Sequence, residues 1–287
     1  MRWRLLRTSS RVTIMNKAQL TAALDSIGMR PGRGLGQNFL LDSNLLDAIV
    51  RLAAPQPGEV ILEVGPGFGA LTEKLLKTGA KVYSIEFDHR IADYLRKNLH
   101  HENFTLIEDD ACRANLQAIL PEGVPFRSIA NLPYSISSIF LARLLELPQL
   151  PESMTFMLQR EMAERLAAEP GCKAYGALSV RAQHAYEVKL DRIVPPEVFF
   201  PPPEVESAIA VFRRREQAPD LLERKHLAGV VKTAFANRRK QMGKVLGANY
   251  GKDLVYSAFE AMQLPLEIRP DRVSPEMFAE LTGKLFK

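Results

Sequence analysis

The chain has 287 residues, of which 46% are hydrophobic and 25% are charged, and it carries a formal net charge of +5 at pH 7. This length allows one large or two modest domains, and no apolar run approaches the roughly 18 residues that spanning a membrane requires, so an integral membrane protein is excluded. The two cysteines, Cys112 and Cys172, lie far apart without a C-x-x-C partner, which argues against a disulfide framework and a zinc site and favours a reducing compartment.

Residues 1–14 form a basic extension with four arginines and no acidic residue. This composition resembles that of a transit peptide. However, Met15 opens a plausible helix of its own, so a start codon placed too far upstream or a disordered basic arm explains the extension at least as well. We exclude these residues from the fold and expect a cytoplasmic protein, with a mitochondrial address as the minor alternative.

A polar, glycine-containing loop over residues 31–42 precedes the first expected strand. It ends in an apolar triplet, and the helix expected over residues 44–54 is capped by Asp42 or Ser43. Because the loop lies just before the first strand, it can fold back over the glycine turn that follows that strand. The helix has an apolar face that should pack on one face of the sheet.

The stretch VILEVGPGFGAL, residues 60–71, predicts a buried strand, a glycine turn and the start of a helix. Gly65, Gly67 and Gly69 allow the backbone to turn sharply and to approach a ligand closely. Their spacing is G-x-G-x-G, whereas a dinucleotide site needs G-x-G-x-x-G, and no basic residue is nearby. The stretch therefore favours a nucleotide-like ligand without a phosphate group.

Two further apolar runs also end at acidic residues. Residues 82–85 precede Glu86, about twenty residues after the glycines, where a doubly wound sheet places an acid against ribose hydroxyls. Residues 104–107 precede Asp109 and Asp110, and a carboxylate there can accept a hydrogen bond from an adenine amino group. Each residue alone is equally well a turn glycine or a solvated acid, but the ordered set looks like the S-adenosylmethionine (SAM) site of a Rossmann-like methyltransferase.

A fourth strand, expected over residues 126–130, runs directly into Asn131-Leu132-Pro133-Tyr134. Helices expected over residues 88–99 and 116–120 alternate with the strands, which predicts an α/β fold with a parallel sheet covered on both faces. Because proline cannot continue a central strand, the tetrapeptide lies at the carboxyl edge of the sheet. Open α/β sheets bind their ligands along that edge.

The tetrapeptide has the groups needed to activate an exocyclic adenine nitrogen, whose lone pair is delocalised into the ring. The side-chain oxygen of Asn131 and the main-chain oxygen of Leu132 would accept its hydrogens and direct its lone pair at a methyl sulfonium, with Pro133 fixing the carbonyl direction. Tyr134 would stack on the base and Phe199 would cover its other face, which requires an unpaired or flipped base. The structural alternative is a strand-to-loop turn with a buried tyrosine.

The second half of the chain first continues the alternation and then becomes purely helical. Helices are expected over residues 139–147, 159–168 and 177–185, and strands over residues 154–158, 187–194 and 207–212. Beyond Arg215 only helices are expected, over residues 221–235, 238–246, 254–262 and 275–286, which predicts a small all-α second domain from about residue 217. Basic residues crowd this part, at 213–215, 238–240 and 244, and they indicate either phosphate-backbone contacts or a solvated helix face.

Eight segments, taken in order, closely resemble the small-subunit ribosomal RNA adenine N6,N6-dimethyltransferase family: GLGQNFLLD, EVGPGFGALT, SIEFD, EDDA, NLPYSISS, FMLQREMAERL, KAYGALSV and FFPPPEVESA. The resemblance is dense over roughly residues 34–213 and looser in the helical tail. It implies SAM contacts for Asn38, Leu40, Gly65, Gly67, Glu86, Asp110 and Asn131. It implies catalytic roles for Asn131, Leu132, Pro133 and Tyr134, with Phe199 stacking on the base. Asp110 is preferred to Asp109 because the acid of the family directly precedes an alanine.

The resemblance also implies the substrate and the partners. The substrate would be a pair of adjacent adenines in the hairpin loop near the 3′ end of 16S ribosomal RNA, each methylated twice with SAM as cofactor and without a metal. Residues 15–216 would form the catalytic domain, and residues 217–287 would bind RNA, with Arg238, Arg239 and Lys240 on the phosphates. We expect a monomer that acts on the pre-30S particle in small-subunit biogenesis.

Three alternatives remain open at this point. A large-subunit ribosomal RNA methyltransferase of the macrolide-resistance type is the nearest, although GLGQNFLLD and the long C-terminal domain favour the small-subunit enzyme by analogy. A DNA adenine or protein glutamine methyltransferase would more typically carry D-P-P-Y or N-P-P-Y. A mainly non-catalytic assembly factor would not need the acids and the tetrapeptide that this chain retains.

Overall fold

The computed structural model describes residues 15–30 and 38–286, so the basic extension and residues 31–37 of the polar loop lie outside the described part. The described chain divides into two compact units. The first contains the residues up to Pro133 together with Pro196–Glu204, and the second contains Tyr134–Pro195 and the residues from Val205 onward. Along all of these residues, every helix is too short or too polar to pass through a lipid bilayer.

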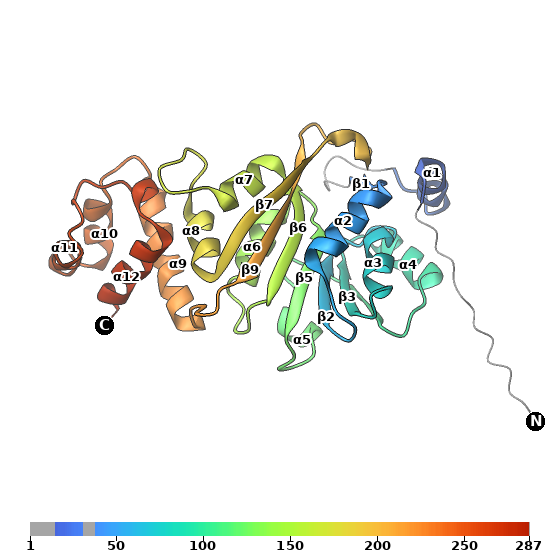
Figure 1. Ribbon diagram of the computed structural model, residues 1–287, viewed down its shortest axis with the longest axis horizontal. Coiled ribbons are helices and arrows are strands. Elements are labelled where there is room, and N and C mark those ends of the chain that lie inside the picture. Colours follow the sequence, from blue (N-terminus) through green and yellow to red (C-terminus); the bar gives the residue numbers. More distant parts are fainter. Residues whose placement is uncertain (1–14, 31–37, 287) are drawn as a thin grey trace, which may run out of the picture. The chain divides into compact units, whose positions relative to one another are not determined.

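The first unit is built on four parallel strands in the order β4-β3-β2-β5 (Figure 1). The strands are β2 (Val60–Val64), β3 (Lys81–Glu86), β4 (Phe104–Glu108) and β5 (Phe126–Asn131). The helices are α1 (Lys17–Ser26), α2 (Ser43–Ala53), α3 (Ala70–Leu76), α4 (His89–Asn98) and α5 (Leu116–Ile119). Every residue of β2 is buried, as expected for a central parallel strand covered on both faces. The four strands lie where the apolar runs predicted them.

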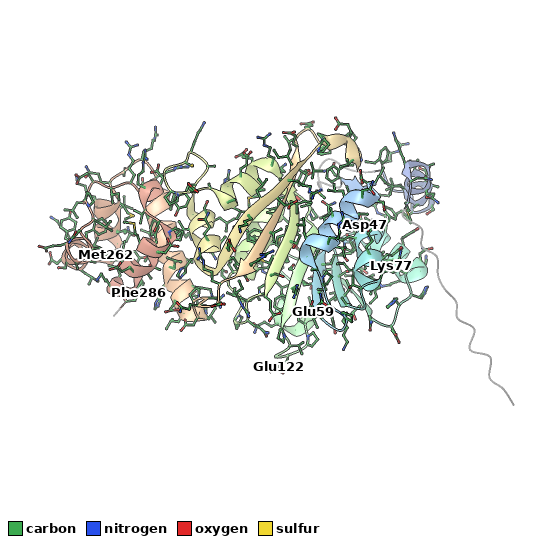
Figure 2. All side chains as sticks on the ribbon, in the orientation of Figure 1. Asp47, Glu59, Lys77, Glu122, Met262 and Phe286 are labelled. Carbon is green, nitrogen blue, oxygen red and sulfur yellow. The ribbon has the colours of Figure 1, made fainter. Side chains whose placement is uncertain are left out.

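The structure identifies which of the two candidate residues, Asp42 or Ser43, caps helix α2. The side chain of Asp42 accepts a hydrogen bond from the backbone N–H of Leu45 at 2.9 Å, so Asp42 is the N-cap and Ser43 is the first helical residue. The largely buried Nζ of Lys74 on α3 pairs with Asp47 on α2, which Figure 2 labels. This ion pair joins α2 to α3, which lie against each other on the sheet (Figure 1).

A two-stranded antiparallel sheet joins two segments that are far apart in the sequence. Strand β1 (Phe39–Leu40) pairs with β8 (Phe199–Phe200), which follows the short helix η2 (Pro196–Val198). Phe39 lies opposite Phe200 and Leu40 lies opposite Phe199. Strands of two residues carry no periodicity, so the sequence did not predict this pairing. Its consequence is that Leu40 and Phe199, both predicted site residues, lie side by side.

The second unit combines three antiparallel strands, in the order β6-β9-β7, with helices. The strands are β6 (Ser153–Gln159), β7 (Tyr186–Val194) and β9 (Ser207–Arg214). The helices are α6 (Ser137–Leu144), α7 (Arg160–Ala167), α8 (Ala177–Ala185), α9 (Leu221–Ala236), α10 (Met242–Tyr250), α11 (Lys252–Ala261), η3 (Pro270–Arg272) and α12 (Pro275–Leu285). Strand β9 lies between the other two, with Ser207 opposite both Gln159 and Val194.

The helix predicted over residues 238–246 was placed too early, because it begins at Met242. Residues 237–241 form a turn in which the backbone N–H of Lys240 donates to the carbonyl of Asn237 at 2.8 Å. The guanidinium of Arg238 donates to the carbonyl of Lys173 at 2.8 Å. These contacts hold the basic stretch in a turn rather than on a helix.

Helices α9 to α12 bury a core that also includes residues from earlier in the chain. Their apolar side chains share one cluster with Tyr175, just before α8, and with Val180 on α8. The phenol of Tyr175 donates to the carbonyl of Val273 at 2.9 Å. The predicted domains, residues 15–216 and 217–287, and the roles assigned to them stay predictions.

The guanidinium of Arg224 links α9 to the segment that follows α6. The side chain is only 8% exposed. It donates to the carbonyls of Leu145 and Leu147 at 2.8 and 2.9 Å, and to those of Pro148, Pro219 and Asp220 at 3.1 to 3.2 Å. Because burial penalises the charged form, the pKa of this group is lowered, and the five carbonyl acceptors compensate for the lost hydration.

We predict that Arg224→Met lowers the free energy of unfolding by about 2–4 kcal/mol, since the variant keeps the apolar stem but leaves several buried carbonyls without their donor. Urea denaturation followed by circular dichroism measures this change. The neighbouring, exposed Lys225 supplies the control Lys225→Met, whose midpoint should stay near that of the wild type. Equal midpoints for the two variants would contradict the assigned role of Arg224.

Candidate active site

The glycine turn between β2 and α3 is the centre of the candidate site. Gly65, Gly67 and Gly69 have φ angles of 67°, 56° and 89°, which side chains rarely allow. A Cβ atom at Gly65 would lie 3.0 Å from the ring of Pro133, and one at Gly67 would lie 3.1 Å from the ring of Phe39. The glycine turn, the segment around Pro133 and the strand that contains Phe39 therefore lie in contact. The sequence predicted that the glycines would allow such a close approach.

Glu86 at the end of β3 lies against the same turn. Its carboxylate is 6% exposed and accepts a hydrogen bond from the backbone N–H of Asp88 at 2.8 Å. Burial raises its pKa to about 7, although the backbone amides of Asp88, Phe87 and Gly67 favour the charged form. The interaction with Gly67 places this acid at the turn, where a ribose-binding carboxylate was expected, and its ribose contact stays a prediction.

Asp109 and Asp110 follow β4, at the neighbouring strand end. The backbone N–H of Asp109 donates to the carbonyl of Glu86 at 3.0 Å, which joins the two strand ends. Asp109 is exposed, whereas Asp110 is half-buried and accepts a hydrogen bond from the N–H of Cys112 at 2.8 Å. Arg113 lies 3.6 Å from the carboxylate of Asp110. The adenine contact assigned to Asp110 stays a prediction.

Asn131 is the last residue of β5, and its side-chain amide is oriented by the residue that precedes β1. The Nδ2 atom donates to the main-chain oxygen of Asn38 at 3.3 Å. Because the nitrogen is used in this way, the amide presents its oxygen as an acceptor. Leu132 is buried, and Pro133 packs on Gly65. Asn131 thus contacts the residue before β1, and it lies two residues before the proline that packs on the glycine turn.

Tyr134 is the next residue in the chain and the first of the second unit. Its hydroxyl shares a hydrogen bond with the Oγ atom of Ser207 at the start of β9. Burial raises the pKa of the Tyr134 phenol, which therefore stays neutral near pH 7. This hydrogen bond fixes the phenol within the second unit, and the stacking role of the ring stays a prediction.

Phe199 and Leu40 lie beside each other on β8 and β1. Their side chains are 3% and 6% exposed, so both are covered by neighbouring residues. The pairing brings Phe199 beside Leu40, although the two residues lie far apart in the sequence. The proposed stacking of Phe199 on a base stays a prediction.

Glu63 is a part of the site region to which the sequence assigned no role. It lies in the middle of β2 and is 1% exposed. Its Oε2 atom accepts hydrogen bonds from the hydroxyl of Thr72 on α3 at 2.7 Å and from that of Ser84 on β3 at 2.6 Å. The carboxyl group thus joins the three elements that enclose the glycine turn. An acid inside an apolar strand is unusual and could have indicated a role for Glu63 from the sequence. Its two hydroxyl partners could not be found in this way, because they lie on α3 and β3.

The pKa of Glu63 is raised to about 7, mainly because burial penalises the charged form. The two hydroxyl donors oppose the shift, while the charge of Glu86 adds to it. The folded protein therefore keeps a proton on Glu63 at a pH where the unfolded chain, with its ordinary value of 4.5, has lost it. As a result, the contribution of Glu63 to stability is present below pH 4.5 and is lost as the pH rises through about 7.

We predict that Glu63→Gln weakens the pH dependence of stability between pH 5 and pH 8. The wild-type free energy of unfolding should fall by up to about 1.4 kcal/mol more per pH unit than that of the variant, because the amide binds no proton. Urea denaturation at several pH values measures both slopes. Glu122→Gln, at an exposed position labelled in Figure 2, serves as the control. Parallel slopes for wild type and Glu63→Gln would contradict the assigned protonation.

The sequence profile of the family described as "Ribosomal RNA adenine dimethylase" matches residues 29–278. The chain is 37% identical over 285 residues to "Ribosomal RNA small subunit methyltransferase A" of Ligilactobacillus salivarius, with 96% of each chain covered. It is 41% identical over 218 residues to the protein of that name from Leptothrix cholodnii, covering 76% of this chain and 80% of the relative.

Two solved structures are similar over most of the chain. A dimethyladenosine transferase from Plasmodium falciparum superposes with a TM-score of 0.73 at 25% identity, covering 85% of this chain and 95% of that one. The 23S rRNA methyltransferase ErmE superposes with a TM-score of 0.67 at 28% identity, covering 87% of this chain and 100% of that one. Together with the parallel strands and their helices, these likenesses confirm the predicted α/β fold of a Rossmann-like methyltransferase.

Proposed function

Since the chain belongs to the ribosomal RNA adenine dimethylase family, we propose that it methylates the N6 amino groups of adenosines in small-subunit ribosomal RNA, with SAM as methyl donor. Relatives that carry the small-subunit name are 33–41% identical to it, whereas the 23S rRNA enzyme ErmE is 28% identical. The substrate that we propose is the pair of adjacent adenosines in the hairpin loop near the 3′ end of 16S RNA, each dimethylated. Large-subunit RNA remains the alternative substrate.

The observation that carries this proposal is the contact of one glycine turn with two chemically different strand ends. Glu86 interacts with the backbone of Gly67, and Pro133 of the Asn-Leu-Pro segment packs on Gly65. A nucleoside bound by the acid would therefore lie next to the groups that hold the acceptor amine. In this arrangement Asn38, Leu40, Gly65, Gly67, Glu86, Asp110 and Asn131 bind SAM.

The residues at the end of β5 prepare the adenine nitrogen for attack. The oxygen of the Asn131 amide and the main-chain oxygen of Leu132 accept the two hydrogens of the amino group, which localises the lone pair on nitrogen. SAM bound at the glycine turn would supply an electrophilic methyl group to this nitrogen, with the neutral thioether as the leaving group. The methylated nitrogen then loses its proton to water, so the chain needs no anionic general base.

The aromatic residues act on the base itself. Tyr134 stacks on one face of the adenine and Phe199 covers the other, which holds a base that has left its stack. The proposed reaction also requires that an adenine with one methyl group already in place can bind again, because each base is methylated twice.

The turn between α9 and α10 provides the proposed grip on RNA. Arg239 and Lys240 are exposed there, while Arg238 is held by its hydrogen bond to the carbonyl of Lys173. Exposed cations such as these can contact phosphate groups irrespective of the RNA sequence. We propose that the protein acts as a monomer on the pre-30S particle in the cytoplasm.

Mass spectrometry of ribosomal RNA tests the proposed reaction. Small-subunit particles from a strain that lacks this modification are incubated with the purified protein and labelled SAM, and the RNA is then digested and mapped. We expect two adjacent dimethyladenosines in the 3′ hairpin. Label in large-subunit RNA would move the protein to the alternative substrate, and no label in any RNA would overturn the proposed activity.

We predict that Asn131→Ala lowers the rate of methyl transfer by about 100-fold or more, by analogy with removal of a single preorganised hydrogen-bonding group from an active site. Affinity for the RNA should stay near normal, because the phosphate contacts are elsewhere. Single-turnover assays and filter binding measure the two quantities. Asn98→Ala, at an exposed position on α4, is the control. Full activity of Asn131→Ala would contradict the mechanism.

We predict that replacing both Arg239 and Lys240 by alanine weakens RNA binding and makes it less sensitive to salt. Each lost phosphate contact should reduce the slope of log affinity against log salt by roughly 0.7 to 0.9. Fluorescence anisotropy over a range of salt concentrations measures this slope. The double variant of Lys81 and Lys97, which are exposed on the first unit, provides the matched control. An unchanged slope would exclude the turn from the RNA interface.

A further inference from the structure

Helix α1 lies before the part of the chain that the family profile matches, yet it packs on the glycine turn. The profile begins at residue 29, and α1 spans Lys17–Ser26. Its first turn has a reciprocal cap: the side chain of Asn16 accepts from the N–H of Gln19, and the side chain of Gln19 accepts from the N–H of Asn16, both at 2.9 Å. The first turn of α1 is therefore stabilised by its own cap.

The contact of α1 with the turn is made through Phe68. This residue lies between Gly67 and Gly69, and its side chain is 7% exposed. It belongs to one apolar cluster with the buried face of α1 and with α4, whose members are Leu20, Ala23, Leu24, Met29, Phe68, Ile91 and Leu95. Hence the large side chain of the turn is fixed between two helices.

Aromatic contacts extend the same cluster to β1 and β8. The ring of Phe68 lies 5.2 Å from that of Phe39 and 4.9 Å from that of Tyr94, centre to centre. Phe39 in turn covers Gly67 and lies opposite Phe200 on β8. The Nζ atom of Lys17 on α1 lies 5.0 Å from the centre of the Phe200 ring. Helix α1 thus contacts the turn and the strand pair that follows the polar loop.

These contacts matter for ligand binding because three of the five residues from Gly65 to Gly69 are glycines, and only Pro66 among them has a φ angle fixed by its own ring. Glycine loses more conformational freedom on ordering than any other residue, and here three glycines alternate within five residues. A ligand that had to order this turn would bind more weakly than one that met it already ordered. The anchored side chain of Phe68 is the means by which α1 can keep the turn ordered in advance.

We propose that α1 is a positioning element of the cofactor site, which fixes the glycine turn through Phe68 and the strand β1 through Phe39 and thereby raises the affinity for SAM. The inference rests on the proposed function, because it assumes that SAM is the ligand of the turn. Phe68, Leu20 and Leu24 act through the turn and are positioning residues rather than catalytic ones.

The test uses the full-length protein with Leu20 and Leu24 both changed to serine, which removes the apolar contacts of α1. The control changes Ala22 and Asp25 on the exposed face of the same helix to serine. We expect the Kd for SAM, measured by calorimetry, to rise about tenfold in the first variant, within the usual range of coupling between sites, and to stay unchanged in the control. The KM for SAM should rise in parallel, with kcat at saturating SAM and the Kd for RNA within about twofold of wild type.

Two further measurements separate positioning from general loss of structure. Phe68→Ala should weaken SAM binding as strongly as the α1 variant does, and Phe68→Leu, which still fills the cluster, should restore most of the affinity. Because coupling between sites is reciprocal, SAM should slow hydrogen exchange at the amides of α1 in the wild type.

The outcomes distinguish the two claims. If the wild-type protein did not bind SAM, the proposed function would fail and the inference with it. If the wild type bound SAM and the α1 variant bound it equally well, only the inference would fail. A joint loss of SAM binding, RNA binding and kcat in the α1 variant would also overturn the positioning role, since it would indicate general unfolding.

Discussion

The close approach of Pro133 to Gly65 is the constraint on which the candidate site depends. A Cβ atom at position 65 would lie 3.0 Å from the proline ring, closer than ordinary packing allows. The end of β5 can therefore lie against the end of β2 only while the turn lacks a side chain there. Gly67 plays the same part for Phe39. The glycines thus do more than permit a sharp turn, because they let the asparagine segment and β1 lie directly against it.

Three buried carboxyl groups lie on β2, α3 and β3, the elements that meet at this turn. Burial raises the pKa of Glu63, Glu73 and Glu86 to about 7 in each case. A cationic sulfonium nearby would favour the charged forms, so binding of such a ligand should release protons near neutral pH. In the absence of a cation the same groups reduce the stability of the fold at high pH. Such shifted pKa values of grouped titratable residues are a pattern typical of binding sites.

Local patterns in the sequence were sufficient for most of the fold. The four parallel strands follow from their apolar runs, and the glycine turn follows from the spacing of Gly65, Gly67 and Gly69. The start of α2 follows from a capping residue, for which the sequence offered both Asp42 and Ser43. Strand alternation likewise placed Glu86 and Asn131 at one edge of the sheet. These features depend on residues close together in the chain.

The features that were missed depend on residues far apart in the chain. The pairing of β1 with β8 joins two-residue strands that have no periodicity. The partners of Glu63 are single hydroxyls on α3 and β3, and Tyr175 adds to the core of helices that begin many residues later. The helix that begins at Met242 was placed too early because the interaction of Arg238 with the 172–173 segment cannot be seen locally. Such contacts emerge only when the chain is folded.

If the strand ends around the glycine turn form the proposed SAM site, the Glu86→Gln variant should bind SAM more weakly than the wild type does. The variant preserves the volume of the side chain but replaces a carboxylate, which can accept from both ribose hydroxyls, by an amide with one acceptor oxygen. Calorimetry should give a Kd roughly tenfold or more above that of the wild type, while Glu102→Gln, at an exposed position, should bind as the wild type does. Equal affinity of Glu86→Gln and wild type for SAM would rule out the ribose contact of Glu86 and with it the proposed SAM site.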